Sequence, residues 1–142
     1  MLSELSGRHD GLWKSTCFEV FTKANDSAAY QEFNFAPIFA WNAYQFDHWR
    51  SGMKPLALKN EPHLVDSRID NRAPDFPDRY ELSVILSAES QSQGPAMASL
   101  TAVIEEKDGT KSYWALAHPV GETPNFHHPD CFVARLPPVT AS

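Results

Sequence analysis

Short runs rich in Phe, Tyr, Val and Ile recur along this chain between clusters of Pro, Asn, Asp and Gly, and helical spacing of apolar residues is hard to find. Residues 17–22 alternate in character, and a polar turn at residues 24–27 follows them. Residues 30–35 alternate again, with Gln31, Phe33 and Phe35 on one face and Tyr30, Glu32 and Asn34 on the other. This pattern of short alternating segments separated by turns is typical of an all-β protein.

The Asp108-Gly109 pair is the strongest hairpin signal, and it predicts that residues 100–105 and 112–118 pair antiparallel. Further strands are expected at residues 41–49, 62–69 and 80–87, with loops at 71–78 and 89–94, a helical turn at 129–131 and a last extended run at 132–136. Because no crossover helix of sufficient length is present, we expect an antiparallel β-sandwich of jelly-roll type. Residues 1–142 then form one domain, with flexible ends at 1–11 and 137–142.

Composition narrows the classes of partner. A formal net charge of -6 lacks the basic field that binding to nucleic acid requires. No apolar run approaches the roughly 18 to 20 residues that span a bilayer, and the polar residues 1–10 do not resemble a signal peptide. We therefore expect a soluble cytoplasmic protein without a membrane partner, in which Cys17 and Cys131 are free thiols.

The densest aromatic stretch, residues 33–49, interleaves rings with amides and charged side chains. Rings stack on the apolar faces of sugars or flat cofactors, and neighbouring polar groups bond hydroxyls. The alternative is that most of these rings fill the core. We expect a ligand surface formed by Glu32, Asn34, Trp41, Tyr44, Trp49 and Arg50, extended by Trp114 and His118 from the hairpin strand. Trp41, Trp49 and Arg50 are expected to be partly accessible.

Glu19 and Glu32 lie on successive predicted strands, where they face either solvent, each other or a common ligand. Paired carboxylates suit acid–base chemistry such as glycoside hydrolysis, and they also suit hydroxyl recognition or calcium binding. Without a known separation, the pair supports ligand binding more directly than catalysis.

The segment from Phe126 to Phe132 holds several metal-ligand residue types, namely His127, His128, Asp130 and Cys131. Adjacent histidines on extended chain point apart, so a shared metal ion requires a sharp turn. The alternative is structural: a polar side chain caps a short turn while Cys131 and Phe132 enter the core. Cys131 beside His128 also resembles a thiolate–base pair, although nucleophilic catalysis needs an aligned oxyanion site as well.

Common enzyme signatures are missing, including the nucleophile elbow, the phosphate-binding loop, the dinucleotide glycine turn and the zinc-protease helix. We therefore predict a non-catalytic module that binds a small, carbohydrate-like ligand. A haem- or metal-binding protein that uses residues 127–131 is the alternative.

Four segments carry a resemblance to a known family: Gly11-Leu12-Trp13, residues 16–21, residues 30–35 and residues 126–132. Together they resemble the bacterial DOMON-like domain proteins, and the spacing of the strand pair is similar to that of family 9 carbohydrate-binding modules. The resemblance implies a jelly-roll β-sandwich that binds a sugar or a haem. The Met and His pattern that ligates haem in that family does not match Met53, Met97 or the histidines here.

The resemblance also implies that strands found in relatives before residues 8–13 are missing, so that the fold is incomplete at its N-terminal side. An uncovered strand edge would then favour self-association.

Overall fold

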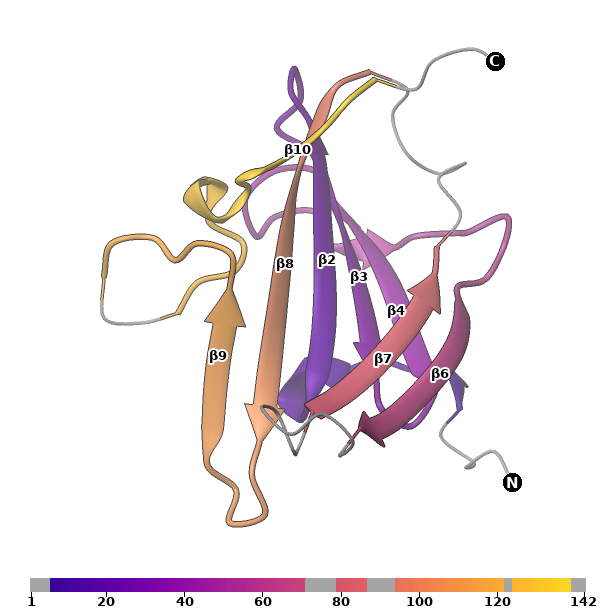
Figure 1. Ribbon diagram of the computed structural model, residues 1–142. Helices are drawn as coiled ribbons and strands as arrows, with labels where there is room; N and C mark the ends of the chain where they lie inside the picture. Colours follow the sequence, from indigo (N-terminus) through magenta and orange to yellow (C-terminus); the bar gives the residue numbers. More distant parts are fainter. Residues whose placement is uncertain (1–5, 71–78, 87–93, 122–123, 139–142) are drawn as a thin grey trace. The chain divides into compact units, whose positions relative to one another are not determined.

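The structure, a computed structural model, describes residues 6–70, 79–86, 94–121 and 124–138 (Figure 1). The chain divides into two compact units, one formed by Met1–Ala57 with Gln91–Ser142 and the other by Leu58–Ser90. The described residues of both units are mostly strands, which confirms the all-β prediction. None of the described helices is long and apolar enough to cross a membrane.

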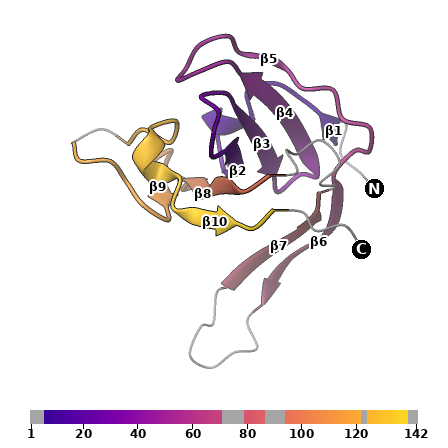
Figure 2. The same cartoon turned by 90° about the horizontal axis from the view of Figure 1, so that it is seen from above.

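The larger unit contains one mixed, eight-stranded sheet. Its strands in spatial order are β1 (Gly7–Arg8), β4 (Ala40–Phe46), β3 (Tyr30–Ala36), β2 (Cys17–Ala24), β8 (Ala96–Glu105) and β10 (Ala134–Leu136). Two further strands complete it: β5 (Lys54–Pro55) pairs with β4, and β9 (Lys111–Ala115) pairs with β8 (Figures 1 and 2). All pairs are antiparallel except that β1 runs parallel to β4. A sandwich arrangement stays a prediction.

The predicted strands of this unit are confirmed, with shifted ends. The strand expected at residues 41–49 stops at Phe46, because Asp47 turns the chain: its N–H donates to the carbonyl of Ser51 (3.0 Å), and Arg50 takes a left-handed φ of 52°. The hairpin at Asp108-Gly109 pairs Glu105 with Lys111 as expected. Pro129–Cys131 forms the predicted single turn, the short helix η3.

The smaller unit is a hairpin of β6 (His63–Asp70) and β7 (Arg79–Ile85), which pair antiparallel with a bulge between Leu64 and Asp66. These strands confirm the expectation of strands near residues 62–69 and 80–87. The loops expected at 71–78 and 89–93 lie outside the described residues.

The segment before β2 is bonded to the sheet. The N–H groups of Gly7 and His9 donate to the carbonyls of Phe39 (3.1 Å) and Trp41 (3.0 Å), and the short helix η1 (Leu12–Lys14) follows. Residues 7–9 thus pair with β4, and Gly7 and Gly11 adopt positive φ angles on either side of this contact. The expected uncovered strand edge stays a prediction.

The register of the central strands gives the sheet two different faces. One face carries a row of Thr101, Glu19, Asn34 and Asn42 from neighbouring strands, and the next row carries Ser99, Phe21, Glu32 and Tyr44. The opposite face carries residues of the other parity, including Phe18, Val20, Phe33, Phe35 and Trp41. Strand alternation therefore concentrates polar side chains on a single face.

Candidate functional site

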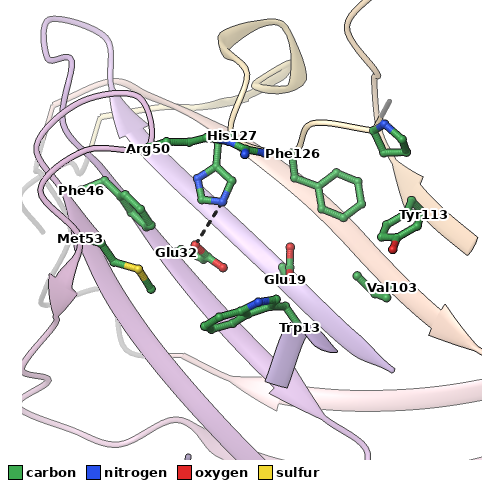
Figure 3. Close-up of a pocket in the computed structure, with 11 residues that line it drawn as sticks. Trp13, Glu19, Glu32, Phe46, Arg50, Met53, Val103, Tyr113, Phe126 and His127 are labelled. Carbon is green, nitrogen blue, oxygen red and sulfur yellow. Dashed lines mark ion pairs between the residues drawn. The ribbon is translucent and has the colours of Figure 1, made fainter. Parts of the chain in front are cut away.

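A pocket of about 450 Å³ opens over the polar face of the sheet (Figure 3). Glu19 and Glu32 lie side by side on its floor, and His127 approaches Glu32 from the segment that precedes η3. The remaining lining residues are Trp13, Phe46, Arg50, Met53, Val103, Tyr113, Pro124 and Phe126. Rings therefore surround a floor that contains two carboxyl groups.

The two carboxyl groups meet because of strand register. Phe21 on β2 pairs with Glu32 on β3, and Glu19 pairs with Asn34, so the glutamates are diagonal neighbours on one face. Diagonal neighbours in a sheet stand about 7 to 8 Å apart at Cα. Both side chains are 4% exposed, so the sheet holds two acidic groups in nearly complete burial.

Glu19 accepts a hydrogen bond of 2.9 Å from the Thr101 hydroxyl on β8. This bond favours the carboxylate, but burial outweighs it and raises the pKa of Glu19 to about 7. Burial, reinforced by repulsion from Glu19, raises the pKa of Glu32 to about 8. Near neutral pH the pair consequently retains protons that ordinary glutamates have lost.

His127 is held in one orientation by Tyr30. The Tyr30 hydroxyl accepts the backbone N–H of Arg50 (3.1 Å) and lies 2.7 Å from Nδ1 of His127. Because the hydroxyl accepts from Arg50, its own proton is available to Nδ1, an arrangement that favours the tautomer with its proton on Nε2, 3.7 Å from an oxygen of Glu32. Burial and nearby Arg50 lower the pKa of His127 to about 4, so this contact joins a neutral imidazole to Glu32 near pH 7.

Asn34 is fully buried between Glu19 and Asn42, yet neither its amide nitrogen nor its amide oxygen has a hydrogen-bond partner among the described residues. The Asn34 side chain lies near enough to Glu32 to favour the carboxylate by hydrogen bonding, which lowers the pKa of Glu32 against the effect of burial, although the contact does not have the geometry of a full hydrogen bond. The fully buried Ser99 hydroxyl on the same face has no partner there either. Buried polar groups without partners are costly, and in native proteins they call for an explanation such as a ligand.

The Asp47–Gly52 turn places Arg50 at the pocket. Gly52 has a φ of 70°, and a Cβ at this position would collide with the Asp47 carboxylate. The turn orients the Arg50 backbone towards Tyr30, while its guanidinium donates to Asn125 Oδ1 (3.0 Å). Arg50 therefore joins the turn to the segment that carries His127.

Several predicted ligand residues lie at this site. Glu19, Glu32 and Arg50 line the pocket, and Asn34 and Tyr44 lie on the same sheet face. Tyr44 is occupied structurally, because its hydroxyl donates to Asp10 (2.8 Å).

Other predicted residues lie elsewhere. Trp41 points to the opposite face and is only 4% exposed, so the expectation that it is accessible was wrong. Its ring lies beneath the Arg8 guanidinium, 5.1 Å from the ring centre. Trp49 is exposed and contacts the His128 ring, and His118 packs near Phe126. Trp114 follows Tyr113 on β9 and therefore points to the opposite face of the sheet. None of these three residues lines the pocket.

The residues of the alternative metal site do not converge. His127 faces Tyr30 and Glu32, whereas His128 Nδ1 accepts the backbone N–H of Asp130 (3.1 Å) at the start of η3. The buried Cys131 thiol donates to the Asn125 carbonyl (3.2 Å). Across the described part of the chain, no group of three or more His, Cys, Asp or Glu side chains is arranged to hold a metal ion. The structural reading of this segment therefore fits the geometry, with His128 as the cap.

Sequence reasoning missed most of the pocket walls. Trp13, Met53 and Pro124 belong to loops or a short helix, where no periodicity reports direction. Strand alternation could have placed three further lining residues, Phe46, Val103 and Tyr113, on the same face as the glutamates. Phe46 pairs with Tyr30, and Val103 pairs with both Cys17 and Tyr113. If the face that carries Glu19 is followed from β8 to β9, it contains Tyr113, so Tyr113 and not Trp114 is the residue to predict at the ligand site.

No protein-family model, curated protein or solved structure matches this chain.

Proposed function

We propose that this protein is a non-catalytic binding module whose pocket takes a small, hydroxyl-bearing ligand of about the size of a sugar. The observation that carries the proposal is the pair of buried carboxyl groups, Glu19 and Glu32, which line the pocket beneath aromatic rings. Asn34, whose amide has no hydrogen-bond partner among the described residues, is buried next to them on the same face of the sheet. A ligand that bonds these groups would compensate the cost of their burial.

The chemistry of the floor suits hydroxyl groups. Carboxyl pairs near their pKa contain both protonated and ionised members, so one donates a hydrogen bond while the other accepts. Trp13, Phe126 and Tyr113 offer ring surfaces around the opening for the C–H face of a sugar. The volume of about 450 Å³ falls within the range of small-molecule sites.

Titration calorimetry against monosaccharides and disaccharides tests this function. We expect binding to the wild-type protein and a loss of about tenfold or more in affinity for Trp13→Ala, in line with the value of an aromatic contact. Trp114→Ala is the matched control, because Trp114 is 63% exposed and outside the pocket, and it should bind as the wild type does. Absence of binding to protein shown to be folded by circular dichroism would overturn the proposal.

A further inference from the structure

The pocket floor has an unbalanced charge. Among the described residues, neither Glu19 nor Glu32 forms an ion pair with a lysine or an arginine. The nearest cation of the pocket, Arg50, is exposed and donates its guanidinium to Asn125. His127, which does reach Glu32, is kept neutral by burial that lowers its pKa. Within the part of the chain that the structure describes, the two buried acidic groups therefore have no charged partner of opposite sign.

Asn34 adds an independent observation. It is fully buried in the same row as Glu19 and next to the row of Glu32, and its amide oxygen is an acceptor without a donor among the described residues. Asn42, its register partner on β4, is also buried on this face of the sheet, but its side chain is fully bonded. The sheet can thus satisfy a buried asparagine, and at Asn34 it leaves the acceptor open beside two carboxyl groups.

We propose that the ligand of this pocket carries a protonated primary amine, which binds over the floor between Glu19, Glu32 and the amide oxygen of Asn34. An ammonium group has three N–H donors and no acceptor, so it can bond oxygens of both carboxyl groups and the open amide oxygen of Asn34. A charge buried with opposite charges and satisfied hydrogen bonds is tolerated where a lone buried charge is not.

The pocket walls also suit a cation. The faces of aromatic rings attract ammonium groups, and Trp13, Phe46 and Phe126 line the pocket around the carboxyl pair (Figure 3). This inference rests on the proposed function and deepens it: the ligand is an amine-bearing polyol rather than a neutral one.

Binding of a cation must be coupled to protons. Burial raises the pKa values of Glu19 and Glu32 to about 7 and 8, so both groups retain protons near neutral pH in the free protein. An ammonium placed beside them favours their ionised forms. The ligand therefore releases protons to the buffer near neutral pH and binds more tightly as the pH rises towards 8. Among the described residues, the other titratable or charged groups on or around this face include Cys17, Lys23, Tyr30, Tyr44 with Asp10, Arg50, Glu105, Tyr113 and His127.

Calorimetry with matched ligand pairs tests the inference on the full chain. The probes are D-glucosamine against D-glucose and N-acetyl-D-glucosamine, and trans-2-aminocyclohexanol against cyclohexane-1,2-diol, at pH 7 in two buffers of different ionisation enthalpy. We expect the amines to bind at least tenfold more tightly than their neutral partners, with proton release on binding.

Glu32→Gln removes the charge and retains the shape. The readout is the ratio of affinities within each matched pair: in this variant the preference for an amine over its neutral partner should fall from at least tenfold to less than about threefold. Glu19→Gln should act in the same direction and serves as the second variant if the first is poorly folded. Glu106→Gln, in the exposed β8–β9 turn, is the matched control and should retain the full preference.

The outcomes separate the two proposals. If neutral polyols bind as tightly as amines, the inference is overturned and the proposed function stands. If the amine preference persists in both glutamine variants, the assigned residues are wrong and the inference is again overturned. If no probe of either kind binds the folded protein, the proposed function is overturned together with the inference.

Discussion

Asn34 and Asn42 are register partners on β3 and β4, and both lie buried on the same face of one sheet, yet their surroundings differ completely. The Asn42 amide nitrogen donates to the His9 carbonyl, to Asp10 and to the Tyr44 hydroxyl, each at 2.9 Å. Its oxygen accepts from Arg8 Nε at 2.9 Å. Asn34 has no such partner among the described residues.

The difference indicates a structural role for Asn42 and a ligand-binding role for Asn34. Around Asn42 the polar groups satisfy one another and fasten residues 8–10 to the sheet, which is what a buried network needs in order to stabilise. Around Asn34 the polar groups are only partly satisfied: Asn34 and Ser99 have no partner among the described residues, and the neighbouring Glu19 and Glu32 line a pocket. Identical residue types thus indicate different roles once their partners are known.

The largest expected effect is that of Asn42→Leu. This substitution leaves the buried Tyr44 hydroxyl and the more exposed Asp10 and Arg8 side chains without their shared partner, so we expect the free energy of unfolding to fall by about 4 kcal/mol. Urea denaturation monitored by tryptophan fluorescence measures it. A loss below about 1 kcal/mol would show that the network contributes little.

The acidic pair next to Asn34 should make stability depend on pH in an unusual direction. Burial raises the folded-state pKa values of Glu19 and Glu32 above those of the unfolded chain, so the native state binds more protons and unfolding becomes easier as the pH rises. We expect a loss of roughly 3 kcal/mol between about pH 6.5 and pH 9. This range lies above the titration of His127, whose lowered pKa acts in the opposite direction at acidic pH.

Denaturant unfolding across this pH range provides the measurement, and the double variant Glu19→Gln/Glu32→Gln provides the control. Its stability should be nearly flat in the same range, because glutamine does not titrate. A wild-type curve that rises with pH would contradict the burial argument.

Asn34→Leu should have the opposite effect to Asn42→Leu. Replacing a buried amide that lacks partners with an apolar side chain of similar size removes a desolvation cost, so stability should stay the same or rise by about 1 kcal/mol. Ligand affinity should fall about tenfold at the same time. Combined denaturation and calorimetry show whether the two effects separate; a variant that loses stability and keeps its affinity would reverse the roles of the two asparagines.

The smallest expected effect is that of Tyr30→Phe. Loss of the hydroxyl removes the bonds to Arg50 and to His127 Nδ1, which should cost about 1 kcal/mol. Nitrogen NMR of the imidazole should then show His127 as a mixture of tautomers instead of the Nε2–H form. An unchanged spectrum would mean that Glu32 alone fixes the ring.

Alternation along the strands was enough to predict the floor of the site. Residues 17–22 and 30–35 place Glu19, Glu32 and Asn34 correctly, because side-chain direction in a strand follows the sequence with a period of two. The same rule places Trp41 on the opposite face from Tyr44 and so argues against a role for Trp41 in the pocket. The prediction that included Trp41 relied on the aromatic composition of residues 33–49 instead.

Alternation could not predict which residues line the sides of the pocket, nor which buried polar groups have hydrogen-bond partners. Trp13 and His127 reach the pocket from a short helix and an irregular segment, whose directions depend on tertiary bonds such as that between Tyr30 and His127. Likewise, nothing in the sequence distinguishes Asn34 from Asn42, because their partners come from distant parts of the chain.

The contacts that build this pocket join remote positions: Glu19 and Thr101 are 82 residues apart, and Tyr30 and His127 are 97 residues apart. Closing such long loops costs entropy before any contact is gained, which slows folding. A nascent chain that has formed only the β2–β3–β4 meander would present the acidic pair without Thr101 or His127. Ligand capture should therefore appear late in refolding, as a kinetic marker that the last strands have joined the sheet.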